Sequence, residues 1–315
     1  MRIPEVTVAD VLDVGRRVKR HLDAWRGTKV PGRNCFRFVA PETTLTFHGQ
    51  GLGDLMIIRQ FGRGFETLLE ERGDPELGDV VVSCGGYKAA YEPDPGDLNL
   101  FWWWSFGPKD DDPAAFLDYY LEEVSVRPDM ICCLSEPCLD EARERGFEAL
   151  HLPLGTQAFR PLGNERSGKG YAGSANHKGS EKERRLLGPH GDDADFEWVT
   201  EFVTPTQLNL WYNTRLVTFG LTKEGQRQWG MVNNRVFETL ASGTPLVLES
   251  HPHVEEILGF DYPYQTSSRR ETVALVEDIE ANPAETLAEF AEYSETVRRE
   301  HSYSRRAETL VDALS

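Results

Sequence analysis

A short predicted helix carries the polar pair of this sequence that is best suited to chemistry. In VNNRVFETLASGTPLVLES, residues 232–250, Asn234 and Glu238 are spaced i,i+4 and therefore share one flank of the helix. Gly243 ends the helix, and the apolar run after Pro245 predicts a buried parallel strand. A carboxylate at this position can accept hydrogen bonds from two neighbouring hydroxyls of a ribose or another sugar. Spacing alone favours a simpler interpretation, in which Glu238 lies on a solvated helix edge.

The loop before this helix has the features of an anion site. It runs through GLTKEGQRQWGMVNNR, residues 220–235, into the first turn of the helix. The first turn presents free N–H groups at the positive end of the helix dipole and is suited to a diphosphate. The residues expected to line this site are Gly230, Met231, Val232, Asn233, Asn234 and Arg235. A diphosphate site one turn from a diol acceptor describes a nucleotide sugar.

A second candidate phosphate contact lies in YAGSANHKGSEKERR, residues 171–185. It consists of a predicted strand, a turn of small residues at Gly173 and Ser174, and a basic helix that contains Lys178 and Arg184. Small residues let the backbone approach a phosphate closely, and cations stabilise the bound charge. An ordinary loop followed by a solvated helix face fits the same residues equally well, so both interpretations stay open.

The elements that must position these residues alternate between strands and helices. The clearest buried strands are predicted for residues 78–84, 98–106, 129–135 and 215–221. This alternation is typical of parallel β-α-β units, whose ligands bind beyond the carboxyl ends of the strands. Residues 155–170 are rich in Gly and lack periodicity, as a domain linker does. We therefore expect two doubly wound, Rossmann-like α/β domains that face a cleft, formed by residues 1–158 and 159–315.

Composition limits the functions open to this chain. The formal net charge is −18 and the pI is near 4.9, so the surface repels phosphate backbones, which argues against binding to nucleic acid. Many carboxylates and few lysines indicate a halophilic protein, because salt screens self-repulsion. The five cysteines show no metal-binding spacing and are expected to be inert core thiols. Without a signal peptide or a long apolar run, we expect a soluble, cytoplasmic protein with no membrane span.

Two motifs of the second half resemble those of a known family. The first, R-x-F-E-x-x-A-x-G-x-P, is present as Arg235, Phe237, Glu238, Ala241, Gly243 and Pro245. The second, H-[ST]-Y-x-x-R, is present as His301, Ser302, Tyr303 and Arg306. Together with LHLPLGTQAFRPL, residues 150–162, they resemble the GT-B glycosyltransferases, and most of all the group 1, spore-maturation-type branch. The resemblance covers residues 129–315. Taken alone, the second motif has the pattern of helix capping and packing.

The resemblance implies a nucleotide-diphosphate sugar held by the second domain, with Glu238 beside its ribose or sugar. The acceptor would be bound mainly by the first domain. The related larger branch has a further Glu at the position that Gly230 occupies here, so the residue that contacts the sugar is undefined. In many such domains a Gly-rich turn after the first strand approaches the donor phosphate and the acceptor. HGQGLGD, residues 48–54, fits that pattern with Gly51, Gly53 and Asp54, although Asp54 fits an ordinary helix cap equally well.

Glycosyl transfer requires a departing diphosphate, an activated acceptor hydroxyl and exclusion of water. Basic and amide groups at 173–185 and 230–234 would stabilise the leaving charge without a metal or other cofactor. An inverting reaction needs a general base from the first domain, and the candidates at predicted strand ends are His48, Asp54 and Asp110, in that order. In a retaining reaction the departing phosphate would instead receive the acceptor proton.

Two further expectations concern aromatic and tail residues. Trp104, in the run of three tryptophans from residue 102, is a candidate for stacking on the acceptor sugar, although core packing explains at least part of the run. The final helix, with His301 and Arg306, is expected to link the two domains as they close over the ligand.

Two other functions fit the same sequence. One is a catalytically degenerate scaffold that binds a nucleotide sugar, which Gly230 and the weak motifs of the first domain favour. The other is a sugar-nucleotide epimerase or hydrolase, because a fold does not fix a reaction. The sequence leaves the acceptor open between a glycan, a lipid-linked sugar and a protein.

Overall fold

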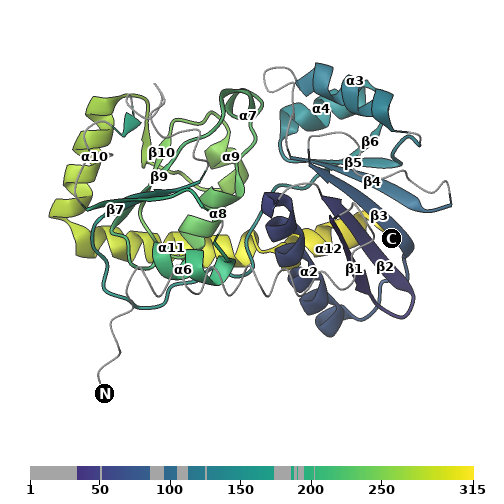
Figure 1. Cartoon of the computed structure of the whole chain (residues 1–315), viewed down its shortest axis with the longest axis horizontal. Helices are drawn as coiled ribbons and strands as arrows, with labels where there is room; N and C mark the ends of the chain where they lie inside the picture. Colours follow the sequence, from purple (N-terminus) through teal and green to yellow (C-terminus); the bar gives the residue numbers. More distant parts are fainter. Residues whose placement is uncertain are drawn as a thin grey trace.

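The strands of the protein form two separate sheets, one in each of two lobes, in the computed structural model (Figure 1). The structure describes residues 34–49, 52–85, 96–104, 113–124, 126–173, 186–187, 190, 195–201 and 203–315. Lys178 and Arg184 of the expected basic helix lie outside these ranges. In the part of the chain that is described, no helix is long and apolar enough to cross a membrane.

The first sheet has the strand order β1-β2-β3-β4-β5-β6, in which β1 pairs antiparallel with β2 and the other neighbours are parallel. Its strands are β1 (Asn34–Val39), β2 (Thr43–Gly49), β3 (Gly78–Gly85), β4 (Leu98–Trp103), β5 (Met130–Cys133) and β6 (Glu148–His151). The helices of this lobe are α2 (Leu52–Arg72), α3 (Pro113–Glu123) and α4 (Glu136–Glu144). The central strands are buried and rich in aliphatic and aromatic residues, as expected for a parallel sheet.

The second sheet is fully parallel and has the order β11-β10-β9-β7-β8. Its strands are β7 (Lys169–Ala172), β8 (Phe196–Val199), β9 (Val217–Gly220), β10 (Leu246–Glu249) and β11 (Gln265–Thr266). The helices are α6 (Pro205–Tyr212), α7 (Glu224–Gln228), α8 (Asn234–Ala241), α9 (Val254–Leu258), α10 (Arg269–Ala281) and α11 (Pro283–Glu300). From β7 the chain goes first to one side and then to the other, so the order reverses between β7 and β9. Such a switch point is where doubly wound sheets bind ligands.

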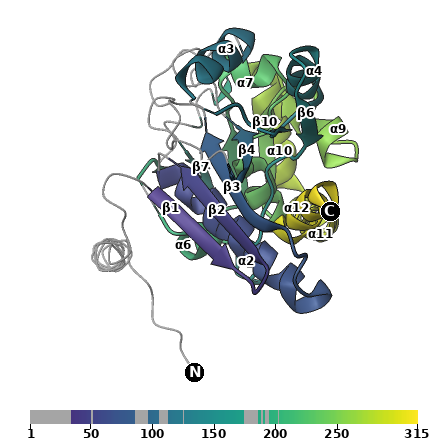
Figure 2. The ribbon, with the colours of Figure 1, turned by 90° about the vertical axis from the view of Figure 1, so that its right-hand side faces the viewer.

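The last helix, α12 (Tyr303–Leu314), leaves the second lobe and packs on α2 of the first (Figures 1 and 2). The contact is close, because a Cβ on Gly64 would lie 2.4 Å from the backbone carbon of Tyr303. A backbone bridge between Thr156 and Ser302 fixes the start of this crossing. The tail therefore contacts both lobes.

Some local predictions need correction. The loop expected at 220–235 contains the short helix α7. The helix after it is buried on more than one face, because Thr239 and its C-cap Ser242 are fully buried together with the apolar residues. The cysteine prediction holds for the described thiols: Cys84, Cys132, Cys133 and Cys138 are free and buried. Burial raises the pKa of Cys132 and of Cys138 to about 12, which keeps both as inert thiols.

Candidate functional site

The switch point of the second sheet brings Gly173 and Arg235 together. Gly173 directly follows β7, and Arg235 lies in the first turn of α8, after β9. A Cβ on Gly173 would lie only 2.3 Å from Nη2 of Arg235, so glycine leaves the room that the guanidinium fills. The guanidinium carbon lies 5.2 Å from the ring centre of Tyr171. Within the described residues Arg235 forms no ion pair, which leaves an uncompensated cation at the carboxyl end of β7.

The first turn of α8 differs in part from its prediction. Asn233 is the N-cap and its side chain accepts a hydrogen bond from the Arg235 amide at 3.1 Å. The amide of Met231 is not free, because it donates to the carbonyl of Gln226 at 2.8 Å. The amides of Val232, Asn233 and Asn234 donate no hydrogen bond to the described part of the chain. Of the four amides expected to bind an anion, the Met231 amide is therefore already bonded, and the other three remain available as far as the described residues show.

Glu238 is buried, and the prediction of a solvated helix edge is wrong. Only 3% of the residue is exposed, and Oε1 accepts hydrogen bonds from Nδ2 of Asn234 at 2.9 Å and from Nε2 of Gln60 at 3.3 Å. Burial raises the pKa of Glu238 to about 7, opposed by the hydrogen bond from Asn234, the charge of Arg235 and the hydrogen bond from Gln60. The predicted i,i+4 contact with Asn234 is confirmed. The carboxyl group therefore titrates near neutral pH, and the Arg235 cation is close enough to favour its ionised form.

Gln60 is the residue of the first lobe that contacts the Glu238 carboxylate. It lies on α2 and is 1% exposed. While Nε2 donates to Glu238, Oε1 accepts from the backbone amides of Gln157 at 3.1 Å and Ala158 at 3.3 Å. A second contact between the lobes joins the hydroxyl of Ser135, after β5, to the carbonyl of Trp229, before α8. The segment from Trp229 to Glu238 therefore lies at the boundary between the lobes.

In the first lobe, the structure pairs Asp54 with Trp104. Asp54 lies in the first turn of α2, and Nε1 of Trp104 donates to its Oδ1 at 3.1 Å. Gly53 is the second residue of the same turn, and His48 lies buried near the carboxyl end of β2. Asp54 therefore lies inside the helix and is not its N-cap. Both titratable groups lie at the carboxyl edge of the first sheet.

The stacking role expected for Trp104 does not fit its surroundings. Only 5% of Trp104 is exposed, and its ring packs edge-on against Trp102 at 5.1 Å. Trp102 and Trp103 are fully buried, and Nε1 of Trp102 donates to the carbonyl of Leu152 at 2.9 Å. Core packing accounts for the whole run of tryptophans, and Trp104 also holds the Asp54 carboxylate.

Several candidate residues lie outside the described ranges. They are Gly51, Asp110, Ser174, Lys178 and Arg184. Their predicted roles in the acceptor turn, in catalysis and in phosphate binding therefore stay predictions.

The second motif, in the tail, forms a buried clamp between the lobes. Arg306 donates to the carbonyls of Pro153 at 2.9 Å and Leu154 at 3.4 Å, and to Nδ1 of His301 at 2.8 Å. Nε2 of His301 donates to the carbonyl of Leu258 at 3.0 Å. Burial lowers the pKa of His301 to about 4, so the ring is neutral and its tautomer is fixed. The motif is structural here, and it sets the arrangement in which Gln60 meets Glu238.

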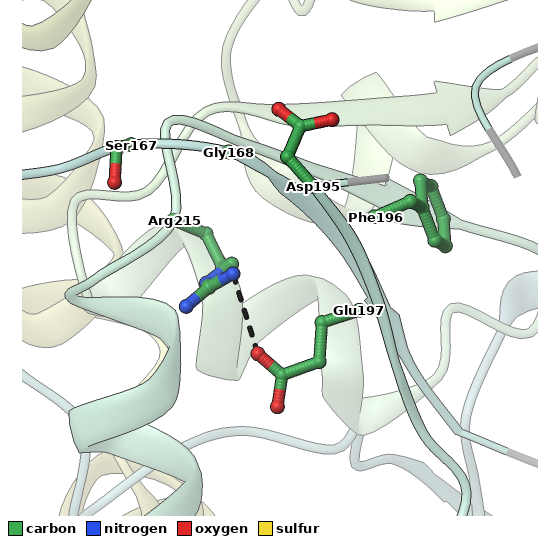
Figure 3. Close-up of a pocket in the computed structure, with 6 residues that line it drawn as sticks. All are labelled: Ser167, Gly168, Asp195, Phe196, Glu197 and Arg215. Carbon is green, nitrogen blue, oxygen red and sulfur yellow. Dashed lines mark ion pairs between the residues drawn. The ribbon is translucent and has the colours of Figure 1, made fainter. Parts of the chain in front are cut away.

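The hollow drawn in Figure 3 lies at the opposite edge of the second sheet. It measures about 510 Å³ and is lined by Ser167, Gly168, Asp195, Phe196, Glu197 and Arg215. These residues surround the amino ends of β7, β8 and β9. Nη1 of Arg215 is paired with Oε2 of Glu197 at 3.3 Å. The hollow therefore belongs to a different part of the lobe from Glu238 and Arg235.

Sequence analysis missed Gln60, His251 and His253. Gln60 is the polar residue among Ile57, Ile58 and Phe61 on the buried side of α2, and this break in an apolar pattern was a usable signal. The two histidines follow β10 directly, at a carboxyl strand end. No group of three or more His, Cys, Asp or Glu suited to hold a metal ion occurs among the described residues.

Similarity to solved structures defines the class of the fold. The T4 phage β-glucosyltransferase, solved with its UDP-glucose substrate, matches at a TM-score of 0.52 and 11% identity over 83% of this chain and 94% of that one. A trehalose 6-phosphate synthase from Burkholderia multivorans matches at 0.51 and 13% over 91% and 87%. A UDP-forming synthase of the same kind from Burkholderia vietnamiensis matches at 0.50 and 12% over 91% of each chain. The chain has the GT-B fold, in two α/β lobes.

The family comparison concerns the second lobe. Residues 174–312 match a family model described as glycosyl transferase-like, and this stretch contains Arg235, Glu238 and the tail motif. No curated protein matches the sequence. The second lobe is thus similar in sequence to glycosyltransferase domains, and the whole chain has the GT-B fold.

Proposed function

We propose that the protein transfers a sugar from a nucleotide-diphosphate sugar to an acceptor hydroxyl. The observation that carries this proposal is the placement of Arg235. Its guanidinium lies at the switch point against Gly173, in the α8 turn whose amides at 232–234 donate to no described residue, and one turn from a buried carboxyl group. A diphosphate is the ligand whose charge and size fit a fixed cation and a helix N-terminus together.

Glu238 is the proposed acceptor for hydroxyls of the donor ribose or sugar. Its Oε1 accepts hydrogen bonds from Asn234 and Gln60, and Oε2 has no hydrogen-bond partner among the described residues. A donor hydroxyl that bonds to Oε2 would offset the desolvation of the charged carboxylate. Binding of the donor would therefore favour the ionised form of Glu238.

The proposed chemistry forms a bond between the acceptor oxygen and the anomeric carbon and breaks the bond from that carbon to the diphosphate. Arg235 and the helix amides would stabilise the negative charge that develops on the leaving diphosphate. In the inverting form, Asp54 or His48 of the first lobe would take the acceptor proton. Trp104 would orient the Asp54 carboxylate through its hydrogen bond to Oδ1. The stereochemistry of the product distinguishes this form from a retaining one.

Three finer assignments belong to the proposal. The chain is placed in the spore-maturation-type branch, on the two motifs of the second lobe. The reaction is independent of metal, because Arg235 and the α8 amides supply the positive charge that a metal would otherwise provide. The acceptor is a glycan, a lipid-linked sugar or a protein.

The test is incubation of the pure protein with UDP-, GDP-, ADP- and dTDP-sugars, with and without EDTA. Release of nucleoside diphosphate by transfer or hydrolysis, unaffected by EDTA, is the expected result. Loss of turnover with EDTA would overturn metal independence alone. Binding without turnover of any donor would favour the scaffold, and interconversion of donor sugars would favour the epimerase.

A further inference from the structure

Gly230 lies against the ring of His253. It occupies the position at which the related larger branch has a glutamate, so no residue has yet been assigned to contact the donor's sugar. Gly230 has a φ of +73°, in the left-handed region that favours glycine. A Cβ at this position would lie 2.9 Å from Cδ2 and 3.0 Å from Cγ of the His253 imidazole. The imidazole thus occupies the space into which a side chain from position 230 would extend. The position of the His253 ring therefore requires a glycine at position 230.

The His253 ring is held so that one nitrogen is free. Nδ1 lies 3.0 Å from Oε2 of Glu256, so it carries the proton that the carboxylate accepts. Nε2 has no hydrogen-bond partner among the residues that the structure describes, and the side chain is 30% exposed. A carboxylate that orients an imidazole in this way leaves the other nitrogen to accept a hydrogen bond from a ligand.

The turn that carries His253 is fixed to the segment that leads into α8. The amide of His253 donates to Nδ1 of His251 at 3.3 Å, so Nε2 of that ring donates to the carbonyl of Met231 at 3.2 Å. Burial lowers the pKa of His251 to about 4, which keeps the ring neutral and both bonds intact. His253 is therefore held in a constant position relative to Gly230 and the first turn of α8.

This arrangement lies on the side of the second lobe that meets the first. The carbonyl of Trp229, next to Gly230, accepts a hydrogen bond from the hydroxyl of Ser135 in the first lobe. Figure 1 shows α7 and α9, which flank these residues in sequence, on the side of the second lobe nearest α4. A donor bound at Arg235 and Glu238 would extend its transferable sugar toward this boundary.

We propose that His253 is a specificity-determining residue for the donor, and that its Nε2 accepts a hydrogen bond from a hydroxyl of the transferred sugar. Glu256 is the positioning residue that orients the ring. This inference rests on the proposed function, because it assigns the sugar end of the same donor site. It predicts that His253 contributes to binding of the nucleotide sugar and not to binding of the nucleoside diphosphate.

The test compares binding of a nucleoside diphosphate with binding of its nucleotide sugar, in the wild type and four variants. Dissociation constants are measured for UDP with UDP-glucose, ADP with ADP-glucose and GDP with GDP-mannose, using wild type, His253→Ala, His253→Gln and Glu256→Ala. For the pair that binds, His253→Ala should weaken the nucleotide sugar about tenfold and change the nucleoside diphosphate less than about twofold. His253→Gln, which keeps an acceptor, should recover part of the loss. Glu256→Ala should cause a smaller loss with the same selectivity, and Glu277→Ala, an exposed control on α10, should change neither ligand.

The outcomes separate this inference from the function on which it rests. Binding of a nucleoside diphosphate and its sugar, with both weakened equally or neither weakened in His253→Ala, would overturn the inference alone. Failure of all three pairs, and of dTDP with dTDP-glucose, to bind the wild-type protein would overturn the proposed function and this inference together.

Discussion

Glu238 and Gln60 are 178 positions apart in the chain and are joined by a buried hydrogen bond of 3.3 Å between Oε1 and Nε2. The same glutamine binds the backbone where the chain passes between the lobes, at Gln157 and Ala158. The carboxyl group proposed to contact the donor is thus held by the lobe proposed to bind the acceptor. Any change in the relative position of the lobes must break or remake this bond.

Replacement of Glu238 by Gln should remove a pH dependence of stability. The pKa of Glu238 is about 7 in the folded protein and near 4.5 when unfolded, so its contribution is fully present below about 4.5 and is lost as the pH rises to about 7. The loss is on the order of 3 kcal/mol. Urea unfolding of wild type and Glu238→Gln at pH 5 and pH 8 measures it, and Glu277→Gln is an exposed control. A difference between wild type and Glu238→Gln that stays constant with pH would contradict the assignment.

Replacement of Gln60 by Glu should destabilise the protein in the same pH range. The new carboxylate can still accept from the amides of Gln157 and Ala158, but it places a second negative oxygen against Oε1 of Glu238. Two buried carboxyl groups in contact cannot both ionise without a large cost. We expect a loss of about 2 kcal/mol or more at pH 8 and a smaller loss at pH 5. Equal stability of this variant and wild type at pH 8 would show that the bond between the lobes does not form.

Replacement of Arg235 by Gln should weaken diphosphate binding selectively. Loss of the charge-assisted contact should raise the dissociation constant for the nucleoside diphosphate about tenfold and leave the free nucleoside unchanged. Gly173→Ala should act in the same direction, because the added Cβ displaces the guanidinium. Calorimetric titration of both ligands is the measurement, with the exposed Arg270→Gln as control. A parallel change for nucleoside and diphosphate would remove Arg235 from the phosphate site.

Replacement of Arg306 by Leu should destabilise the fold more than the same change at Arg305. Arg306 is half-buried and donates to the buried carbonyls of Pro153 and Leu154 and to His301, so its loss leaves buried acceptors without donors. A loss of about 3 kcal/mol in the free energy of unfolding is expected. Arg305 is exposed and pairs only with Glu308 among the described residues, so its loss should cost less than about 1 kcal/mol. Similar losses for the two variants would show that the tail motif does not clamp the lobes.

The local pattern of the sequence was sufficient for the elements of the second lobe. Alternating strands and helices, the stop at Gly243 and the Asn234–Glu238 spacing depend on neighbouring residues, and the structure has each of them. The burial of Glu238 was not predictable in this way, because Gln60 on another lobe covers it. The hydrogen bond from the Met231 amide to Gln226 and the five-residue helix α7 were not predicted either, because helix propensity does not identify so short a helix.

The candidate site shows the same division. The sequence indicated Arg235 and Gly173 as members of separate segments, but only the strand order places them in contact. The role of Trp104 depends on its hydrogen bond to Asp54, a residue 50 positions away, and the hydrophobic periodicity of the sequence does not predict such a contact. Gln60 and His253 act through partners distant in the chain, so a single sequence marks them only as polar residues in unusual surroundings.

The most direct test of the central claim is a crystal structure of the protein with the nucleoside diphosphate that binds most tightly among UDP, ADP, GDP and dTDP. The account predicts the diphosphate between Gly173, the Arg235 guanidinium and the first turn of α8, with the ribose hydroxyls in hydrogen-bond contact with Glu238. A diphosphate bound instead at the hollow beside Arg215, at the amino ends of the strands, would contradict it, as would a ribose that makes no contact with Glu238.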